Sequence, residues 1–256
     1  MTQQNKPYQF LEWDTEFFGH RIGRINRHIL GEDLIESIFA WCETDSIECL
    51  YFLANSDDPR TIRTAEEHDF QLVEIRINME RSLKNWDPDT RPKAAQDILI
   101  RPVKPEDIPA IQDIAMNSYI DSRYYFDKCF PKEKWQSYYA TWVRKSCEGG
   151  ADLVLVAEKE HEILGYITGN IVEAENEGIY ELTGVKTSAR RAGVGQELFR
   201  SGLDWYKRAG IDYIWLATQG RNIATQRMVQ RNGFLTKSCQ LYYHKWFHLC
   251  AMKGAA

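Results

Sequence analysis

Several classes of protein are disfavoured by what this 256-residue sequence lacks. No apolar run approaches the roughly 20 residues that a membrane-spanning helix needs. The formal net charge is -5, so there is no surplus of cations to attract nucleic acid or an anionic membrane. The first residues, MTQQNKPYQF, have neither the basic nor the apolar region of a secretory signal. We therefore expect a cytoplasmic protein that binds neither nucleic acid nor membrane.

Metal-binding spacing is also missing. The six cysteines are scattered and form no C-x-x-C pair, which is typical of a reduced intracellular chain. His244 and His248 are four residues apart, but they fall in an aromatic, strand-like run. The sequence therefore predicts no metal site.

One stretch of the chain has the composition of a linker. Residues 82–97, SLKNWDPDTRPKAAQD, carry two prolines and many charges and show no apolar period. This stretch predicts an N-terminal α/β domain over residues 1–85, a linker over residues 86–96 and a second domain over residues 97–256.

The segment RRAGVGQELF, Arg190 to Phe199, places two glycines where a loop meets a helix. A helix N-terminus presents unpaired N–H groups and the positive end of the helix dipole, which together favour phosphate. Glycines let a ligand approach the backbone closely. Ordinary surface turns often have the same composition, so this motif alone leaves both readings open.

Predicted strands and helices alternate around this loop. The strand GIYELTGV precedes it, the helix GQELFRSGLDWYKRAG follows it, and IDYIWLAT has the composition of a further strand. A final helix, IATQRMVQ, leads into a tail, LTKSCQLYYHKWFHL, that is typical of a hairpin or a pair of strands. This order predicts an α/β or α+β fold with a mixed sheet.

The first part of the chain repeats some of this pattern. Residues 60–81 match residues 223–245 as a helix, a small turn before Phe and a strand, with Asp69-Phe70 where Gly233-Phe234 falls. The first copy has no counterpart of the glycine loop before its helix. We therefore predict a partial repeat whose N-terminal copy does not bind the ligand.

The stretch from Ile179 to Phe234 resembles the acyl-CoA-binding core of the GNAT N-acetyltransferase superfamily. The family's phosphate pattern is Gln or Arg, two residues, Gly, one residue, then Gly or Ala, and here it is matched by residues 190–195. The strand-ending Val185, the helix-starting Asn222 and Gly233-Phe234 stand in register with it. The resemblance implies a GNAT fold, a central mixed sheet flanked by helices, over about residues 97–248, with acetyl-CoA as co-substrate and no metal.

A narrower resemblance lies partly outside this core. LEWDTEFFGHRIGRI, SRYYFDKCFPKEKWQSYYATWV and ATQGRN look like stretches of the TDP-fucosamine acetyltransferases. Those two-domain enzymes acetylate the amine of a nucleotide-linked amino sugar, and their N-terminal domain resembles a truncated GNAT half. The resemblance implies the same kind of smaller, GNAT-half-like domain at the N-terminus of this chain.

The family resemblance assigns tasks to the residues around the glycine loop. Backbone N–H groups near the loop would hold the CoA pyrophosphate, the arginines would add charge, and the preceding strand would run beside the pantetheine. Asn222 would reach the cofactor arm, cap its helix, or do both. The implied cofactor-binding residues are Thr183, Val185, Arg190, Arg191, Gly193, Val194, Gly195 and Asn222.

The catalytic residues depart from the family pattern. Many members carry a Tyr four residues before the Gly of Gly-Phe to assist the leaving sulfur, and this chain has Val229 there. Tyr242 is a substitute as general acid, or else a sheet aromatic. Glu181 is the candidate base that would take the amine proton, or else a surface glutamate. Arg123 and Tyr124 would bind a diphosphate and stack on a base, or else pack two helices.

The sequence therefore predicts an acetyl-CoA-dependent N-acetyltransferase that acts on a small-molecule amine, with a nucleotide-linked amino sugar as the sharpest candidate. Two alternatives stay open: a GNAT enzyme for another amine, such as an amino acid, a polyamine or a protein N-terminus, and a non-catalytic acyl-CoA-binding protein. The sequence is also compatible with a homodimer.

Overall fold

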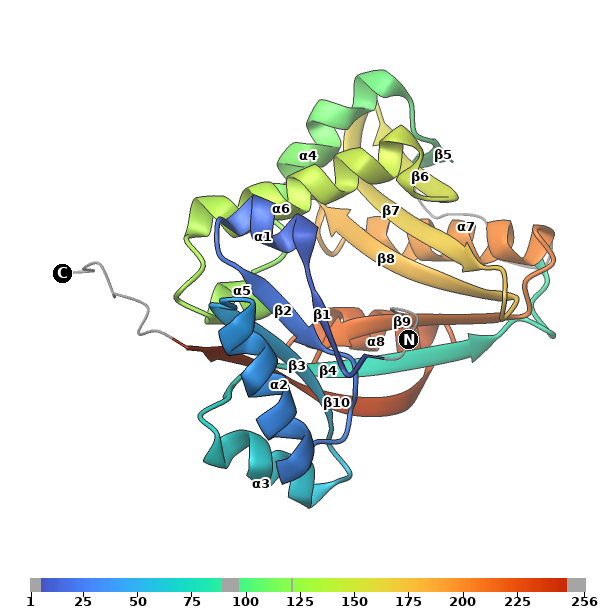
Figure 1. Cartoon of the computed structure of the whole chain (residues 1–256). Helices are drawn as coiled ribbons and strands as arrows, with labels where there is room; N and C mark the ends of the chain where they lie inside the picture. Colours follow the sequence, from blue (N-terminus) through green and yellow to red (C-terminus); the bar gives the residue numbers. More distant parts are fainter. Residues whose placement is uncertain (1–5, 89–96, 121, 248–256) are drawn as a thin grey trace.

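A computed structural model describes residues 6–88, 97–120 and 122–247 of the chain. The described residues form one mixed sheet of ten strands in the order β1-β2-β3-β10-β4-β9-β8-β7-β6-β5 (Figure 1). The strands are β1 Tyr8–Phe10, β2 Ile22–Ile25, β3 Cys49–Asn55, β4 Gln71–Ser82, β5 Leu99–Pro102, β6 Leu153–Lys159, β7 Glu162–Val172, β8 Glu177–Val185, β9 Tyr213–Gln219 and β10 Leu235–Trp246. This architecture is the mixed α/β GNAT fold that the resemblance implied.

The α-helices lie between the strands along the chain. They are α1 Glu12–Phe18, α2 Glu32–Thr44, α3 Pro59–Glu67, α4 Ile108–Met116, α5 Arg123–Phe126, α6 Lys132–Lys145, α7 Val194–Arg208 and α8 Ile223–Arg231. Two 3-10 turns, Pro105–Asp107 and Thr187–Ala189, precede α4 and α7, and a π-helical turn, Ser146–Gly150, follows α6. No helix among these is long and apolar enough to span a membrane.

Only two neighbouring pairs of strands are parallel. β2 pairs with β3, and β8 pairs with β9, and all other registered pairs are antiparallel. A parallel pair needs a crossover connection, which α2 provides in the first case and α7 in the second. The two parts of the chain thus contain the same β-α-β unit.

The predicted helix–turn–strand repeat is confirmed. α3 and β4 in the first part correspond to α8 and β10 in the second. The two turns also share a backbone conformation, because Asp69 has φ 58° and Gly233 has φ 79° before the matching phenylalanines. A left-handed residue is a common way to end a helix, and it turns each chain into the following strand.

The repeated strands β4 and β10 each pair with a strand from the other part of the chain. β4 lies between β10 and β9, so a strand from the first part is enclosed by two strands of the second (Figure 1). The tail expected as a hairpin or a pair of strands is instead the single strand β10, because β3 and β4 pair with its two edges. The division of the chain at residues 86–96 stays a prediction, and residues 89–96 lie outside the described residues.

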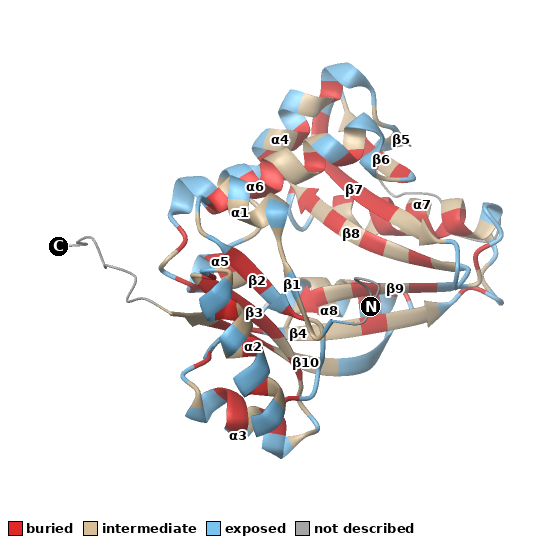
Figure 2. Ribbon diagram, viewed as in Figure 1, coloured by how far each residue is buried: buried red, intermediate tan, exposed pale blue. Residues whose placement is uncertain are grey.

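Helices cover both faces of the sheet around β7 and β8. α7 packs on one face through residues such as Leu198 and Tyr206, while α4 and α6 pack on the other through residues such as Ile114 and Tyr138. Buried and partly exposed residues alternate along β8, as expected where successive side chains point to opposite faces (Figure 2). β8 is thus contacted by α7 and by α4.

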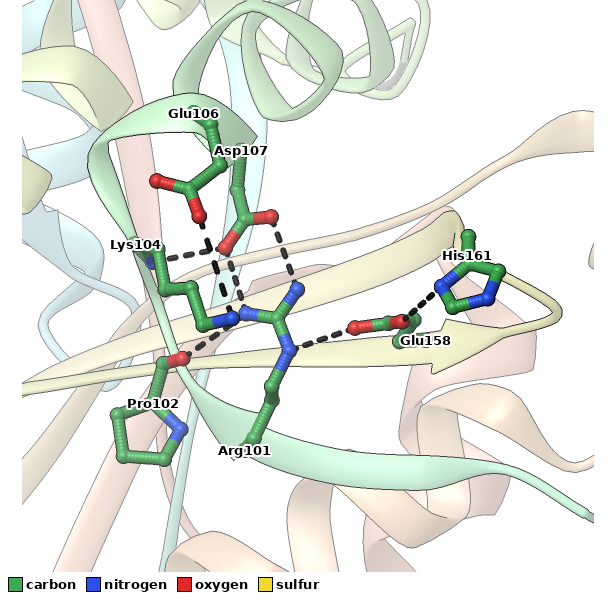
Figure 3. A network of polar contacts seen from close by, with 7 residues as sticks. All are labelled: Arg101, Pro102, Lys104, Glu106, Asp107, Glu158 and His161. Carbon is green, nitrogen blue, oxygen red and sulfur yellow. Dashed lines mark hydrogen bonds and ion pairs between the residues drawn. The ribbon is translucent and has the colours of Figure 1, made fainter.

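The edge strand β5 is tied to its surroundings by Arg101 (Figure 3). The guanidinium donates to both carboxylate oxygens of Asp107 at 2.7 and 2.9 Å and to Glu158 on β6 at 2.6 Å. Asp107 also accepts from the backbone N–H of Lys104 at 2.7 Å. These charged hydrogen bonds lower the pKa of Asp107 and anchor the start of the second part to the sheet.

Candidate active site

A notch opens between β8 and β9. The two strands are in register only from Glu177 to Tyr180 on β8 and from Tyr213 to Leu216 on β9. Beyond these residues the strands diverge, as Figure 1 shows. The ends of β8 and β9 that follow therefore do not pair with each other, and this leaves peptide groups on their facing edges for a ligand.

The glycine loop lies where β8 leads into α7. Gly193 caps α7 with φ 83°, a left-handed conformation that favours glycine. The first intrahelical donor is Glu197, whose N–H donates to the carbonyl of Gly193 at 3.1 Å. No side chain of the described residues caps this first turn, so the preceding amides are free for an anion.

The loop, β8 and α8 converge at Gly195. A Cβ there would lie 3.2 Å from the sulfur of Met228 on α8 and 3.6 Å from the side chain of Val185 on β8. Glycine therefore allows the start of α7 to approach both neighbours. The glycine loop therefore lies directly beside Val185, the residue at which β8 ends next to the notch.

Arg190 lies beside a cavity at this end of β8. Its guanidinium donates to the carbonyls of Val185 at 3.3 Å and Asn117 at 3.4 Å. The cavity measures about 510 Å³, and its lining is Asp113, Ile114, Asn117, Val185, Lys186, Thr187, Ser188 and Arg190. Arg191 is exposed, and its φ of 67° turns the backbone toward the start of α7.

Local contacts define the surroundings of Asn222, which precedes α8, and of Val229 within α8. The side chain of Asn222 accepts from the N–H of Thr225 at 3.1 Å, so the helix-capping role is confirmed, and its contact with a cofactor stays a prediction. Val229, at the position of the usual Tyr, is fully buried in the core beneath α7 and α8. A hydroxyl for the leaving sulfur would have to come from another element.

The two candidate catalytic residues lie on different strands. Glu181 directly follows the paired part of β8, where burial raises the pKa of its carboxyl and Asn170 donates a hydrogen bond to it. Tyr242 lies buried on β10, in register with Glu74 on β4. Their roles stay predictions.

The predicted acceptor residues Arg123 and Tyr124 are brought together with Tyr242. The guanidinium of Arg123 lies 4.3, 4.4 and 5.0 Å from the ring centroids of Tyr124, Tyr242 and Tyr51. It donates to the hydroxyl of Tyr124, which in turn donates to Asp14 at 3.1 Å. Arg123 is thus enclosed by aromatic rings from both parts of the chain.

This cluster contains residues that the sequence interpretation did not select. Asp14, Tyr51 and Glu74 all come from the first part, and the hydroxyl of Tyr51 is buried with no partner among the described residues. Burial raises the pKa of the Asp14 carboxyl, and the charge of Arg123 opposes that shift. Asp14 stands in the quoted motif LEWDTEFFG, which was the only sequence signal for it.

His244 completes the buried side of the cluster. Its ring stacks on Tyr51 at 4.5 Å, and Nδ1 lies 2.6 Å from Asp127. Burial lowers the pKa of His244 to about 4, so the neutral ring donates from Nδ1 to the carboxylate. No group of three His, Cys, Asp or Glu residues in the described chain could hold a metal, and His248 lies outside it.

Comparisons with known proteins agree with the fold. The sequence model of the Acetyltransferase (GNAT) family matches residues 110–234. The spore coat polysaccharide biosynthesis protein SpsD of Bacillus subtilis (strain 168) is 26% identical over 145 residues, 57% of this chain and 50% of that protein. The chain thus spans about half the length of this relative. The mycothiol acetyltransferase of Stackebrandtia nassauensis is 23% identical over 235 residues, 90% of this chain and 73% of that protein.

Solved structures share the architecture across most of the chain. A GCN5-related N-acetyltransferase from Sphaerobacter thermophilus has a TM-score of 0.67 at 17% identity, covering 93% of this chain and 76% of that one. A tandem GNAT protein from the clavulanic acid biosynthesis pathway has a TM-score of 0.64 at 13% identity, covering 89% and 76%. At these identities the likeness establishes the fold. The sequence match therefore covers residues 110–234, and the fold shared with these structures is the GNAT fold.

Proposed function

We propose that the chain is an acetyl-CoA-dependent N-acetyltransferase for a small-molecule amine. The observation that carries this proposal is the open notch between β8 and β9, which is continuous with the uncapped start of α7. A CoA pyrophosphate at that helix start would let the pantetheine arm run along Thr183 and Val185 on β8. The thioester would then enter the notch.

The proposed reaction is direct transfer. The amine attacks the thioester carbonyl while both substrates are bound, and the CoA thiolate leaves. Holding the two reactants together supplies much of the acceleration. Because a thiol has a pKa of about 8.5, its departure does not require a proton donor, although Tyr242 is available on β10.

We propose a nucleotide-linked amino sugar as the acceptor, handled in the cytoplasm. Support comes from the quoted sequence motifs and from a relative named for polysaccharide biosynthesis. The second relative is named for mycothiol, so other amines remain the alternative acceptor class. Arg123 and Tyr124 are the proposed acceptor residues, and they lie at the junction of the two parts of the chain.

A CoA-release assay tests the proposal. Purified protein is incubated with acetyl-CoA and a panel of amines that includes TDP-linked amino sugars, amino acids and polyamines. Release that depends on one amine class identifies the acceptor. Tight acetyl-CoA binding with no release for any amine would instead indicate a non-catalytic binding protein, for which Val229 is the supporting observation.

A further inference from the structure

Glu74 is a buried carboxylate that the roles described so far do not use. It lies on β4 and is 8% exposed. One carboxylate oxygen accepts from the backbone N–H of Arg123 at 2.9 Å. A buried carboxylate is rare without strong pairing, and no ion pair within 4 Å joins Glu74 to a cation of the described chain.

The sheet register places Glu74 beside the open end of the notch. Arg76 on β4 is opposite Gln219, the last residue of β9, and Glu74 is two residues further along β4. The Gln219 side chain donates a hydrogen bond to Glu74. Residues two apart share a face of the sheet, so Glu74 extends the wall that β9 forms.

Tyr119 and Arg123 form hydrogen bonds to opposite sides of the notch. The hydroxyl of Tyr119 donates to the carbonyl of Thr183 on β8 at 3.4 Å, and the N–H of Arg123 donates to Glu74 on β4. Arg221, just beyond β9, also lies 3.7 Å from the ring centroid of Phe126 on α5. Glu74 therefore lies beyond the last paired residue of β9, at the end of the sheet where β8 and β9 no longer pair.

We propose that Glu74, a residue of the first part of the chain, accepts the proton that the acceptor amine loses. This inference rests on the proposed acetyltransferase function. An acceptor that arrives as an ammonium ion gives one proton to Glu74, and the free amine then forms the N–C bond with the thioester carbonyl. The C–S bond breaks and the CoA thiolate leaves, the second amine proton then passes to that thiolate, and Glu74 returns its proton to solvent.

The electrostatic surroundings suit this role. Burial raises the pKa of Glu74, and the charges of Arg123 and Arg76 partly oppose the rise. Tyr242 on β10 is in register with Glu74, and burial raises the pKa of Tyr139 on α6, which also interacts with the Glu74 charge. A carboxylate with a raised pKa is a stronger proton acceptor than an ordinary one.

The test compares isosteric Glu→Gln variants. Glu74→Gln keeps an oxygen to accept from Arg123 and removes the base, so kcat should fall by about 10²- to 10⁴-fold. Glu80→Gln is the matched control: Glu80 lies on the same strand, where it pairs with Lys237 at 2.7 Å on the surface, and kcat should stay within threefold of wild type. The acidic limb of the wild-type kcat/KM profile should lie above the usual glutamate range and disappear in Glu74→Gln.

Glu181→Gln tests the competing assignment, in which Glu181 on β8 is the base. Normal turnover in Glu74→Gln, with a large loss in Glu181→Gln, would overturn the proposal and move the base to β8. In that outcome the acetyltransferase function itself would stand, because the wild-type protein turns over. Absence of turnover in the wild type for every amine would count against the proposed function instead.

An infrared titration decides the placement of Glu74 without turnover. The band of the protonated carboxyl that is lost in Glu74→Gln identifies this residue. Binding of acetyl-CoA should displace water from the notch and raise the pKa that this band reports. A titration unchanged by acetyl-CoA at saturating concentration would show that Glu74 is not at the reacting end of the notch.

Discussion

The two parallel strand pairs of the sheet have the same topology but different ends. In the second part, β8 and β9 diverge and leave an open notch. In the first part, β2 and β3 also stop pairing, after Arg24 and Tyr51, but the following segment fills the gap. The carbonyl of His28 accepts from the N–H of Asn55 at 2.8 Å, and the ring Nδ1 of His28 lies 2.7 Å from the carbonyl of Leu53.

The helices that follow β2 and β8 also differ at their N-termini. α2 begins with Glu32 and Asp33, whose negative charges occupy the positive end of the helix dipole. α7 begins with Val194 and Gly195 after a left-handed Gly193, and leaves its first amides open to an anion. The two copies of the shared topology therefore differ in whether peptide groups at the helix start are left for an anion. This difference supports the prediction that the first copy does not bind acetyl-CoA.

The largest expected effect is the loss of acetyl-CoA affinity when the glycine loop before α7 is blocked. Gly193→Glu places a carboxylate where the pyrophosphate would bind, and should weaken acetyl-CoA binding by at least about 100-fold, because hydrogen bonds to charged groups contribute about 1.5–3 kcal/mol each. Calorimetry measures this. Gly210→Glu is the matched control: Gly210 has φ 81° and the same open surroundings at the far end of α7. Equal affinity in both variants would remove the phosphate-loop assignment.

The junction of the two copies provides the next test. Arg123→Ala removes a guanidinium enclosed by Tyr51, Tyr124 and Tyr242, and should raise the KM for a nucleotide-linked acceptor by about 10- to 150-fold, the equivalent of one charged hydrogen bond. The affinity for acetyl-CoA should not change. Thermal unfolding shows whether the variant is folded, and Arg123→Lys provides a charge-retaining comparison. Normal kinetics with a TDP-amino sugar would take Arg123 out of the acceptor site.

A smaller effect, on the free energy of unfolding, is expected when a buried hydrogen bond in the first part of the chain is removed. Thr61 is fully buried, accepts from the N–H of Leu30 at 2.9 Å and donates to Asp58 at 2.8 Å. Thr61→Val leaves a buried donor without a partner, which should lower the free energy of unfolding by about 1–3 kcal/mol. Urea denaturation measures the loss. Acetyl-CoA affinity should be unchanged, and a reduced affinity would mean that the two copies are coupled.

The smallest expected effect compares the caps of the two repeated helices. Asn222→Ala removes the cap of α8 and should cost about 1 kcal/mol of stability. Asp58→Ala removes the corresponding cap of α3, where Asp58 accepts from the N–H of Arg60 at 3.1 Å. If Asn222 also contacts the cofactor, only its variant should lower acetyl-CoA affinity. Unchanged affinity in both would limit Asn222 to capping.

Local features of the site could be predicted because they depend on residues close together in sequence. The loop at residues 190–195 needs glycine for its left-handed turn, and this requirement shows in the sequence as it does in the structure. The repeat of helix, left-handed turn and strand was visible for the same reason, although Asp69 replaces the glycine in one copy. Asn222 was expected both to cap and to bind, and only its cap is a local contact.

Residues that meet across the sheet could not be predicted in this way. The strand pattern of residues 71–82 does not specify which neighbours β4 will have, because edge hydrogen bonds are the same for every strand. β10 was mistaken for a hairpin or a pair of strands because its partners β3 and β4 lie far away in the chain. For the same reason Asp14, Tyr51 and Glu74 were not selected.

The sequence by itself determined the unit β8-α7-β9 and the glycine turn before α7, since backbone conformation and apolar period depend on adjacent residues. Only the tertiary structure decided that β4 lies between β9 and β10 and that His28 closes the first notch while the second stays open. It also decided that Arg123 meets Glu74 and Tyr242. The contacts of Arg123 join segments more than 40 residues apart in the chain, and pairing over such distances is selected by the burial of the whole sheet.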